Sequence, residues 1–394
     1  MSALVTPGNL RSALAVTRSL GRAGVAVTVA DEHRHSLAGA SRYCREAVRV
    51  PSPAQSPDAF LHAIQREVER GKHRVLIPTD DIALSLISAA RSRFEGLAVL
   101  PFPDAEIVQL AHDKGALMSL ADEKGIPAPR TVVVREPADV ERAIRSVGFP
   151  AVVKARVSRL MVAGQWRSAA GTHYVHNRAE LEVACRAVGE TVPFPLVQEY
   201  VPGDGRGVFA LMNRGRLRAA FAHRRLREKP PSGGVSVLSE SIALDPQVLG
   251  QAERILEALK WHGVAMVEFK RDARDGVAKL LEINGRFWGS LQLSVDAGVD
   301  FPYLLYQLAL AGDVEPVSTY ATGVRLRWWL GDVDWLLLRL REPDRLRALR
   351  EFLTPAGRLA RGEILRRDDP APAVVELSQY LAAALRGATG GRAR

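Results

Sequence analysis

The chain has 394 residues, a formal net charge of +10, 47% hydrophobic residues and 25% charged residues. This composition predicts a soluble globular protein, and the length predicts two or three domains. The apolar runs are short and broken by charge, which excludes a membrane helix of about 20 apolar residues. We expect no signal peptide, because the N-terminus lacks a basic segment before an apolar core. Cys44 and Cys185 match no metal spacing and fit reduced thiols, so a cytoplasmic location is expected.

The positive charge raises the question of nucleic acid. The excess is rich in arginine, is spread along the chain, and near the C-terminus alternates with leucine at helical spacing, which is typical of a solvated helix face. Zinc-finger spacing and basic–aromatic motifs are absent from the sequence. We therefore expect neither nucleic acid nor a membrane as a partner, and a role for the charge in binding anionic small molecules.

The first hundred residues alternate strands with helices. Strands are predicted at 3–6, 25–31, 73–79 and 97–103, with helices at 9–24 and 82–94, and this alternation indicates an open parallel sheet. The first turn, VTPGNLRS, lacks the G-x-G-x-x-G of a dinucleotide site, although Asp31 ends the second strand. Asp80 and Asp81 follow a strand at the edge where such sheets bind ligands; capping of the next helix is the alternative.

The next segment starts at a boundary near residues 101–103. Two short helices are predicted within 104–124, a helix at 138–146, and a strand at 149–155 that contains Lys154 between apolar neighbours. A lysine there is costly unless it reaches an anion, and extension of its ammonium to solvent is the alternative. Residues 156–175 are interpreted as a hairpin that covers phosphates. A helix at 178–189 and a strand at 195–201 follow.

Residues 208–241 are predicted to contain a hairpin that turns at 213–215. The segment RRLREKPPSGG, residues 224–234, is basic and glycine-rich, and we interpret it as a mobile loop over a phosphate site. A loop with no role is the alternative. A helix is expected at 248–260.

Two further strands, VAMVEFKR (264–271) and VAKLLEIN (277–284), form an antiparallel hairpin by composition. With the turn near Asp275, Glu268 lies opposite Glu282, roughly 5 Å away. Facing carboxylates are costly unless a cation lies between them, and with Asn284 they form the oxygen-donor set that Mg²⁺ takes. The alternative is a surface hairpin with Lys270 and Lys279 as counter-ions.

The order of these motifs resembles the ATP-grasp superfamily, which includes biotin carboxylase, carbamoyl phosphate synthetase and the D-alanine–D-alanine ligases. It is most similar to uncharacterised carboxylate–amine-ligase-like members, from the N-terminus to about residue 315. The resemblance implies an α/β fold: an open parallel α/β domain (1–103), an ATP-grasp domain of two α+β subdomains (104–317, the small one about 150–204), and a mainly helical C-terminal extension (318–394).

The resemblance also implies a role for individual residues. Arg286 contacts the reacting phosphate or carboxylate, and the basic segment holds substrate. The remaining roles are Mg²⁺ (or Mn²⁺) binding with ATP by Glu268, Glu282 and Asn284; phosphate binding by Lys114 and Lys154; adenine and ribose binding by Glu199, Val201 and Asp204; and substrate binding by Arg225 and Lys229. One departure is VAGQWRSAAGTH, which replaces the family's GG-x-G loop, with Gly164 and Gly171 the nearest substitutes.

The implied activity is an ATP-dependent carboxylate–amine ligase that forms an amide through an acyl phosphate. The expected partners are small-molecule carboxylates and amines, with a homodimer as a further possibility. A phosphotransferase, a carboxylase and a non-catalytic nucleotide-binding module remain as alternatives. Trp328, Trp329 and Trp335 in the C-terminal extension are interpreted as core or interface residues.

Overall fold

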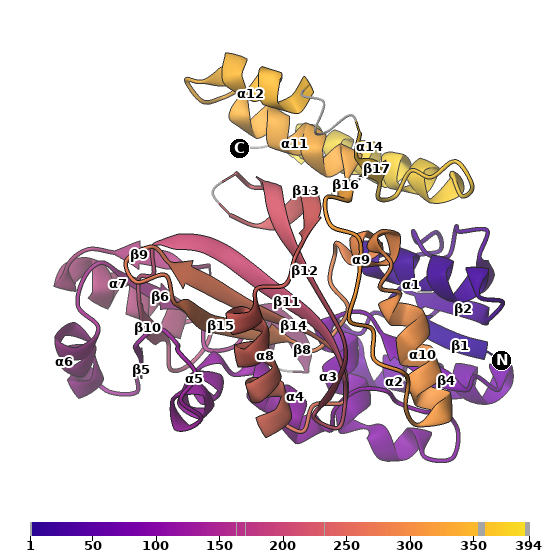
Figure 1. Ribbon diagram of the computed structural model, residues 1–394, viewed down its shortest axis with the longest axis horizontal. Coiled ribbons are helices and arrows are strands. Elements are labelled where there is room, and N and C mark those ends of the chain that lie inside the picture. The colour runs from indigo at the N-terminus through magenta and orange to yellow at the C-terminus, as the bar shows by residue number, and fades with distance from the viewer. Residues whose placement is uncertain (1, 163, 170, 232, 354–358, 391–394) are drawn as a thin grey trace.

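The computed structural model describes residues 2–162, 164–169, 171–231, 233–353 and 359–390. Figure 1 shows the N-terminal domain on one side, a small subdomain on the other, a large sheet between them and the C-terminal helices above. No helix in the described ranges is long and apolar enough to cross a bilayer.

The N-terminal domain is the open parallel sheet that the sequence predicts. Its strand order is β3-β2-β1-β4, every pairing is parallel, and the core residues of β1, β2 and β4 are almost fully buried. The expected strand at 97–103 forms only a bridge between Val99 and Val75. The elements are β1 (Ser2–Thr6), α1 (Arg11–Arg22), β2 (Ala26–Asp31), β3 (Cys44–Arg49), α2 (Pro57–Gly71), β4 (Val75–Pro78), α3 (Asp81–Ala89) and a 3-10 turn (Arg91–Phe94).

Two helices, α4 (Ala105–His112) and α5 (Lys114–Glu123), lead into the small subdomain. Its antiparallel sheet has the order β5-β10-β6-β9, with α6 and α7 packed against it. The predicted hairpin after Lys154 is present as β7 paired with β8. The bounds are β5 (Thr131–Val133), α6 (Pro137–Ser146), β6 (Ala151–Lys154), β7 (Arg159–Val162), β8 (Gln165–Ser168), β9 (His173–Val175), α7 (Arg178–Gly189) and β10 (Leu196–Glu199).

The large sheet has the order β15-β14-β11-β12-β13-β16-β17. The hairpin predicted at 213–215 joins β11 to β12, with Arg214 and Gly215 at positive φ. Helix α8 packs on one face of the sheet, and α9 and α10 pack against α1 of the N-terminal domain. The bounds are β11 (Gly203–Asn213), β12 (Arg216–Lys229), β13 (Val235–Ile242), α8 (Pro246–Ala258), β14 (Gly263–Asp272), β15 (Ala278–Asn284), α9 (Leu291–Ala297) and α10 (Phe301–Ala311).

The interpretation of 224–234 as a mobile loop is wrong for its first half. Residues 224–229 are the end of β12 and pair with β13. The basic side chains are tolerated in a sheet because distant segments supply carboxylates: Arg224 pairs with Glu240, and Arg227 with Asp332. These partners cannot be recognised from the local sequence.

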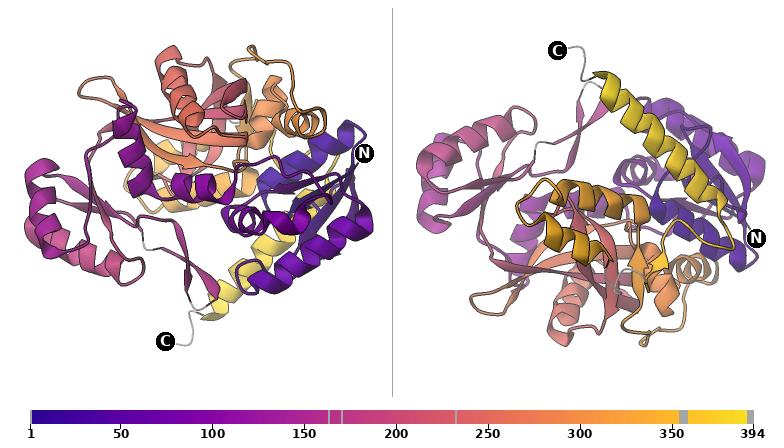
Figure 2. Two further views of the ribbon diagram at one scale, coloured as in Figure 1. Left: turned by 90° about the horizontal axis from the view of Figure 1, so that it is seen from below. Right: turned by 90° about the horizontal axis from the view of Figure 1, so that it is seen from above.

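The C-terminal extension is mainly helical, as expected, and it continues the large sheet through β16. Figure 2 shows α14 lying across the N-terminal domain, where Gln379 hydrogen-bonds Asn9. The buried Arg18 of α1 binds Asp369, which precedes α14. Trp335 is buried, whereas Trp329 is 39% exposed and stacks on Arg327. The bounds are β16 (Arg325–Arg327), α11 (Trp329–Arg339), α12 (Arg345–Leu353), β17 (Arg361–Gly362) and α14 (Ala371–Gly390).

Candidate functional site

The two glutamates face each other as the sequence predicts. In the β14–β15 ladder Glu268 is the register partner of Glu282, and the apolar neighbours Val267 and Ile283 point into the core between the sheet and α8. Strand alternation therefore turns both carboxylates to the opposite face. The side-chain nitrogen of Asn284 lies 3.3 Å from Oε1 of each glutamate, so all three side chains converge on one point.

Cationic side chains neutralise this pair from two sides. Nζ of Lys114, the first residue of α5, lies 3.3 Å from Oε2 of Glu282 and donates a 2.8 Å hydrogen bond to Ser158. On the other side, Nη2 of Arg225 lies 3.1 Å from Oε2 of Glu268. Two carboxylates that would repel each other are thus each held by one cation.

The pKa values of the two glutamates move in opposite directions. Burial, together with the charge of Glu282, raises the pKa of Glu268. Burial also opposes ionisation of Glu282, but the charges of Lys114 and Lys154 outweigh it and lower the pKa of this carboxyl. Glu282 is therefore the permanent anion of the pair, and Glu268 gains most from an added cation.

Lys154 ends β6 close to the carboxylate pair. Burial and then the nearby charge of Lys114 lower its pKa to about 8. Among the described residues no carboxylate lies within ion-pair distance of its ammonium. A half-buried lysine with this surrounding is suited to binding an anionic ligand.

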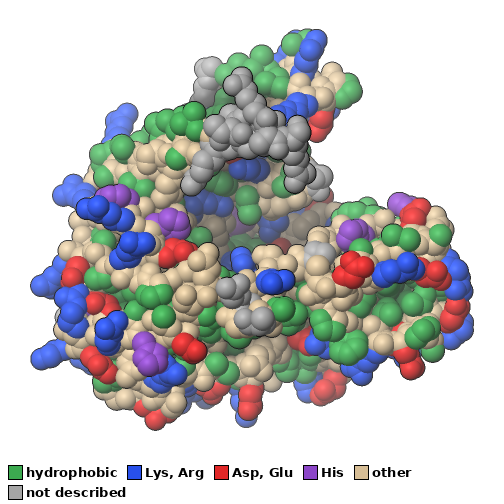
Figure 3. Space-filling view, turned by 180° about the vertical axis from the view of Figure 1, so that it is seen from behind, with side chains coloured by type: hydrophobic (Ala, Val, Ile, Leu, Met, Phe, Trp, Pro, Cys, Tyr) green, Lys and Arg blue, Asp and Glu red, His purple; other side chains and the backbone are tan. Residues whose placement is uncertain are grey.

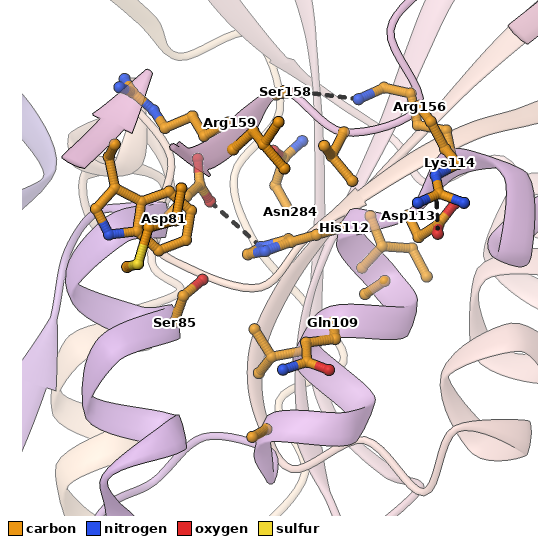
Figure 4. Close-up of a pocket in the computed structure, with 18 of the residues that line it drawn as sticks. Asp81, Ser85, Gln109, His112, Asp113, Lys114, Arg156, Ser158, Arg159 and Asn284 are labelled. Carbon is orange, nitrogen blue, oxygen red and sulfur yellow. Dashed lines mark hydrogen bonds and ion pairs between the residues drawn. The ribbon is translucent and has the colours of Figure 1, made fainter. Parts of the chain in front are cut away.

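Arg286 is held by the N-terminal domain. Its Nε lies 3.3 Å from Oδ1 of Asp81, and its Nη1 donates to the carbonyl of Phe287 at 3.2 Å. The carboxylate of Asp81 also faces His112, whose Nε2 is 3.7 Å away (Figure 4). The neighbouring Asp80 caps α3 by accepting from the Ala83 N–H, which is the capping role that the sequence left open.

Two cavities meet at Glu282 and Asn284. The hairpin cavity, about 540 Å³, lies between α3, α4 and the β7–β8 hairpin, and its polar wall includes His112, Lys114 and Arg159 (Figure 4). The arginine cavity, about 350 Å³, is lined by Arg11, His223, Arg225, Gly234, Val235, Ser236, Met266, Glu268, Glu282, Asn284, Arg286, Trp288, Gly289 and Ser290. Glu282 and Asn284 line both cavities. Figure 3 shows the molecule hollowed beneath the C-terminal helices, with Lys and Arg side chains in the walls of the hollow.

Other predicted residues lie apart from this centre. Glu199 ends β10, is buried, and pairs with Arg130, Arg274 and Lys279, which lower the pKa of its carboxyl despite the opposing effect of burial. Val201 is buried close by. Asp204 has an 85% exposed side chain. The Glu199 carboxylate is already engaged by three cations, so it is not available to contact a base.

Lys229 does not join the site that was predicted for it. Its ammonium pairs with Asp334 of α11 and lies 5.5 Å from the centre of the Trp328 ring. It is absent from the described lining of both cavities. The reason is the folding of residues 224–229 into β12, which directs Arg225 to the cavity and Lys229 to α11. Gly164 and Gly171 flank β8, and no Cβ placed on either would meet another atom within 4 Å.

The donor set fits a magnesium ion that also binds a ligand. Among the described residues no group of three His, Cys, Asp or Glu side chains converges. Two carboxylates and one amide do not fill the octahedral coordination shell of Mg²⁺. This ion commonly binds one or two carboxylates, and phosphates and water complete its shell. For Asn284 to be a ligand, its amide must turn so that Oδ1, which lies 3.5 Å from Nη2 of Arg286, faces the glutamates instead.

Sequence reasoning missed several residues that line this site. Arg11, His112, His223 and Ser290 reach it from α1, α4, β12 and the residue before α9. Their positions depend on how four separate elements pack, and none stands in a motif that signals a site. His112 immediately precedes the Asp113–Lys114 pair, which was the only local signal.

Comparison with known proteins gives one family match and distant relatives. Residues 191–331 match a family described as ATP-grasp in the biosynthetic pathway with Ter operon. The chain is 22% identical over 282 residues to the D-aspartate ligase of Enterococcus faecium, covering 68% of this chain and 67% of that protein.

Two solved structures share the fold. The L-amino acid ligase of Bacillus licheniformis is 19% identical, with a TM-score of 0.62 over 80% of this chain and 74% of that one. The biotin carboxylase domain dimer of Hydrogenobacter thermophilus 2-oxoglutarate carboxylase, in complex with MgADP, ADP and bicarbonate, is 16% identical, with a TM-score of 0.64 over 82% of this chain and 73% of that one.

Proposed function

Because the chain is an ATP-grasp superfamily protein, we propose that it is an ATP-dependent carboxylate–amine ligase that works through an acyl phosphate. The observation that carries the proposal is the convergence of Glu268, Glu282 and Asn284 with a lysine pair on one side and Arg286 on the other. The resemblance to two proteins named as amino-acid ligases supports the choice of a ligase.

The lysines bind the phosphates of ATP in this proposal. Lys154 is half-buried with no carboxylate in ion-pair contact among the described residues, and Lys114 reaches the same point from α5. Together they place positive charge where the β- and γ-phosphates would carry negative charge. A magnesium ion held by Glu268, Glu282 and Asn284 would neutralise further phosphate charge. The backbone at 199–201 would contact the adenine, and Asp204, being exposed, would reach the ribose only from solvent.

Arg286 orients the acid for attack. An oxygen of the substrate carboxylate forms a bond to the γ-phosphorus, the bond to the β–γ bridging oxygen breaks, and ADP leaves. The planar guanidinium of Arg286 suits a carboxylate or an acyl phosphate, and Asp81 fixes its plane. The amine nitrogen then attacks the acyl carbon, phosphate departs with the C–O electron pair, and the ammonium proton passes to solvent, which leaves an amide.

Arg225 occupies the place of a counter-ion for Glu268 at 3.1 Å. If Glu268 were to hold a metal ion, Arg225 would lose this partner and its guanidinium would be free to contact a ligand in the arginine cavity, which it lines. Arg225 is therefore proposed to contact the acid substrate after MgATP has bound. Lys229 has no part in this proposal, because its partner is Asp334.

A carboxylase or a phosphotransferase with the same ATP site is the second candidate, since a carboxylase domain shares the fold. That structure is described as a dimer, and we extend a homodimer to this chain as a proposal that light scattering would test.

An ADP-release screen tests the proposed function. Purified protein with MgATP is mixed with pools of carboxylates, with and without pools of amines, and products are identified by mass spectrometry. We expect ADP release that needs an acid and an amide mass that needs both; Glu282→Gln is the inactive control. Release that depends on bicarbonate alone, or a phosphorylated product stable to amines, would favour the second candidate.

A further inference from the structure

The lining of the arginine cavity has more cationic side chains than the transfer of a phosphoryl group to a carboxylate explains, although Arg11 and Arg286 are ion-paired behind it with Glu363 and Asp81. Its described lining includes Arg11, Arg225 and Arg286, whereas its carboxylates are Glu268 and Glu282 alone. Both glutamates belong to the proposed metal site, so a bound metal would neutralise their charge and leave the arginines of the cavity without carboxylate partners in its lining. Arg286 is assigned to the reacting group. Arg11, which comes from the N-terminal domain, is left without a role.

The C-terminal extension fixes Arg11 in the cavity wall. Nη1 of Arg11 donates to Glu363 at 2.6 Å and to the carbonyl of Ser236 at 3.4 Å, and the guanidinium stacks 4.1 Å from the centre of the Trp328 ring. Both hydrogen bonds that Arg11 makes within the described structure leave from Nη1. The Nη2 side faces Gly289, where an added Cβ would lie 2.8 Å away. The guanidinium is thus oriented in advance, with Nη2 free to donate.

Two buried polar atoms of the same wall have no hydrogen-bond partner in the described structure. They are Nε1 of Trp288 and Nδ1 of His223, in side chains that are 2% and 6% exposed. His223 uses its other nitrogen with Ser290 Oγ at 2.8 Å, and burial, aided by the charge of Arg225, lowers the pKa of His223 to about 3, so the ring is neutral. Buried polar atoms without partners are rare, and both side chains belong to residues that line the arginine cavity.

We infer that the acid substrate is a small molecule with a second anionic group, a carboxylate or a phosphate, and that Arg11 recognises this group. The inference rests on the proposed function, since it assigns the reacting carboxylate to Arg286. The cavity of about 350 Å³ is of the size that small ligands occupy. The second anion accepts from Nη2 of Arg11, and the indole N–H of Trp288 is the additional donor. Arg11 is therefore a specificity residue, outside the phosphoryl transfer.

Binding of matched acids tests the inference. Calorimetry is done on the full chain with a non-hydrolysable ATP analogue and Mg²⁺, using succinate against butyrate, glutarate against pentanoate, and phosphoglycolate as the phosphate probe. We expect each dicarboxylate to bind about tenfold or more tightly than the monoacid of equal carbon number, because a charge-assisted hydrogen bond is involved. Phosphoglycolate binding better than both dicarboxylates would identify the second group as a phosphate.

Three variants connect the preference to Arg11. Arg11→Gln should reduce the ratio of dicarboxylate to monoacid affinity to within about threefold. This single change leaves the buried Glu363 carboxylate without its partner. The double variant Arg11→Gln/Glu363→Gln removes the same cation and leaves no unpaired buried charge. Gly289→Ala keeps the charge but displaces Nη2, and should also lower the ratio. Arg22→Gln, on the same helix with the half-exposed partner Asp368, is the control that should change nothing.

The outcomes separate this inference from the proposed function. Equal binding of dicarboxylates and monoacids, no binding of any dianion, or a preference that survives in the double variant would each overturn the role of Arg11. A protein that binds succinate through Arg11 but never releases ADP with any acid would contradict the ligase proposal and leave the recognition of a dianion standing.

Discussion

Replacement of Lys154 by arginine tests the electrostatics of the ATP site most sharply. The pKa of Lys154 is lowered to about 8 by burial and by Lys114. The ammonium must be charged to bind a phosphate, so ATP binding takes up a proton whenever the free lysine is neutral. With a pKa of about 8, roughly 90% of the side chain is charged at pH 7 and roughly 10% at pH 9. ATP affinity should therefore fall about tenfold between these pH values.

The lowered pKa of Lys154 determines how ATP affinity changes with pH. Because the free protein has the lower pKa and a bound phosphate raises it, affinity is fully present below about pH 7 and is lost as the pH rises through 8. Near pH 8 about half a proton should be taken up per ATP bound, which calorimetry in two buffers of different ionisation enthalpy measures. Arginine stays charged throughout, so Lys154→Arg should lack this uptake.

Comparison of wild type with Lys154→Arg removes the contribution of other titrating groups to the change in ATP affinity. ATP itself and His112 titrate equally in both proteins, so only the difference between wild type and Lys154→Arg reports on residue 154. If both proteins lose affinity equally between pH 7 and pH 9, Lys154 is not the phosphate-binding cation and the reasoning fails.

Three further changes address the reacting centre. Glu282→Gln should lower turnover about 10²-fold or more with an unchanged melting temperature, because it removes the permanent anion of the glutamate pair; near-normal turnover at saturating Mg²⁺ would refute the assignment. Arg286→Ala should lower acid-dependent ADP release far more than ATP affinity, with poor rescue by Lys, whereas parallel losses of turnover, affinity and melting temperature would indicate a structural arginine. Asp81→Asn should lower turnover about tenfold, since Arg286 keeps its charge but loses its orienting carboxylate, and an unchanged rate would exclude that positioning role.

The facing glutamates could be predicted because strand periodicity and one turn determine them. Alternation along 264–271 and 277–284, with a turn near Asp275, was enough to oppose Glu268 and Glu282, and the ladder has that register. The parallel N-terminal sheet was likewise indicated by the order of strands and helices. Both inferences use only residues that are close in sequence.

Features that depend on distant partners could not be predicted. The basic segment after His223 looks unsuited to a sheet when it is read alone. It forms a strand because Glu240, Asp332 and Asp334, which belong to other elements, neutralise its side chains. Arg11 is held in the cavity wall by Glu363, Ser236 and Trp328, the first of which lies 352 positions away in the chain. No local pattern records such a pair, so the wall of the arginine cavity emerges only from the folded structure.

Isotope transfer between the acid and the released phosphate tests the central claim most directly. The acid found in the ADP-release screen is labelled with ¹⁸O in both carboxylate oxygens and incubated with MgATP and the amine. If the carboxylate attacks the γ-phosphate and the amine then displaces phosphate, each released phosphate carries one ¹⁸O and the amide retains the other. Phosphate without the label would contradict an acyl-phosphate intermediate, and with it the proposed ligase mechanism.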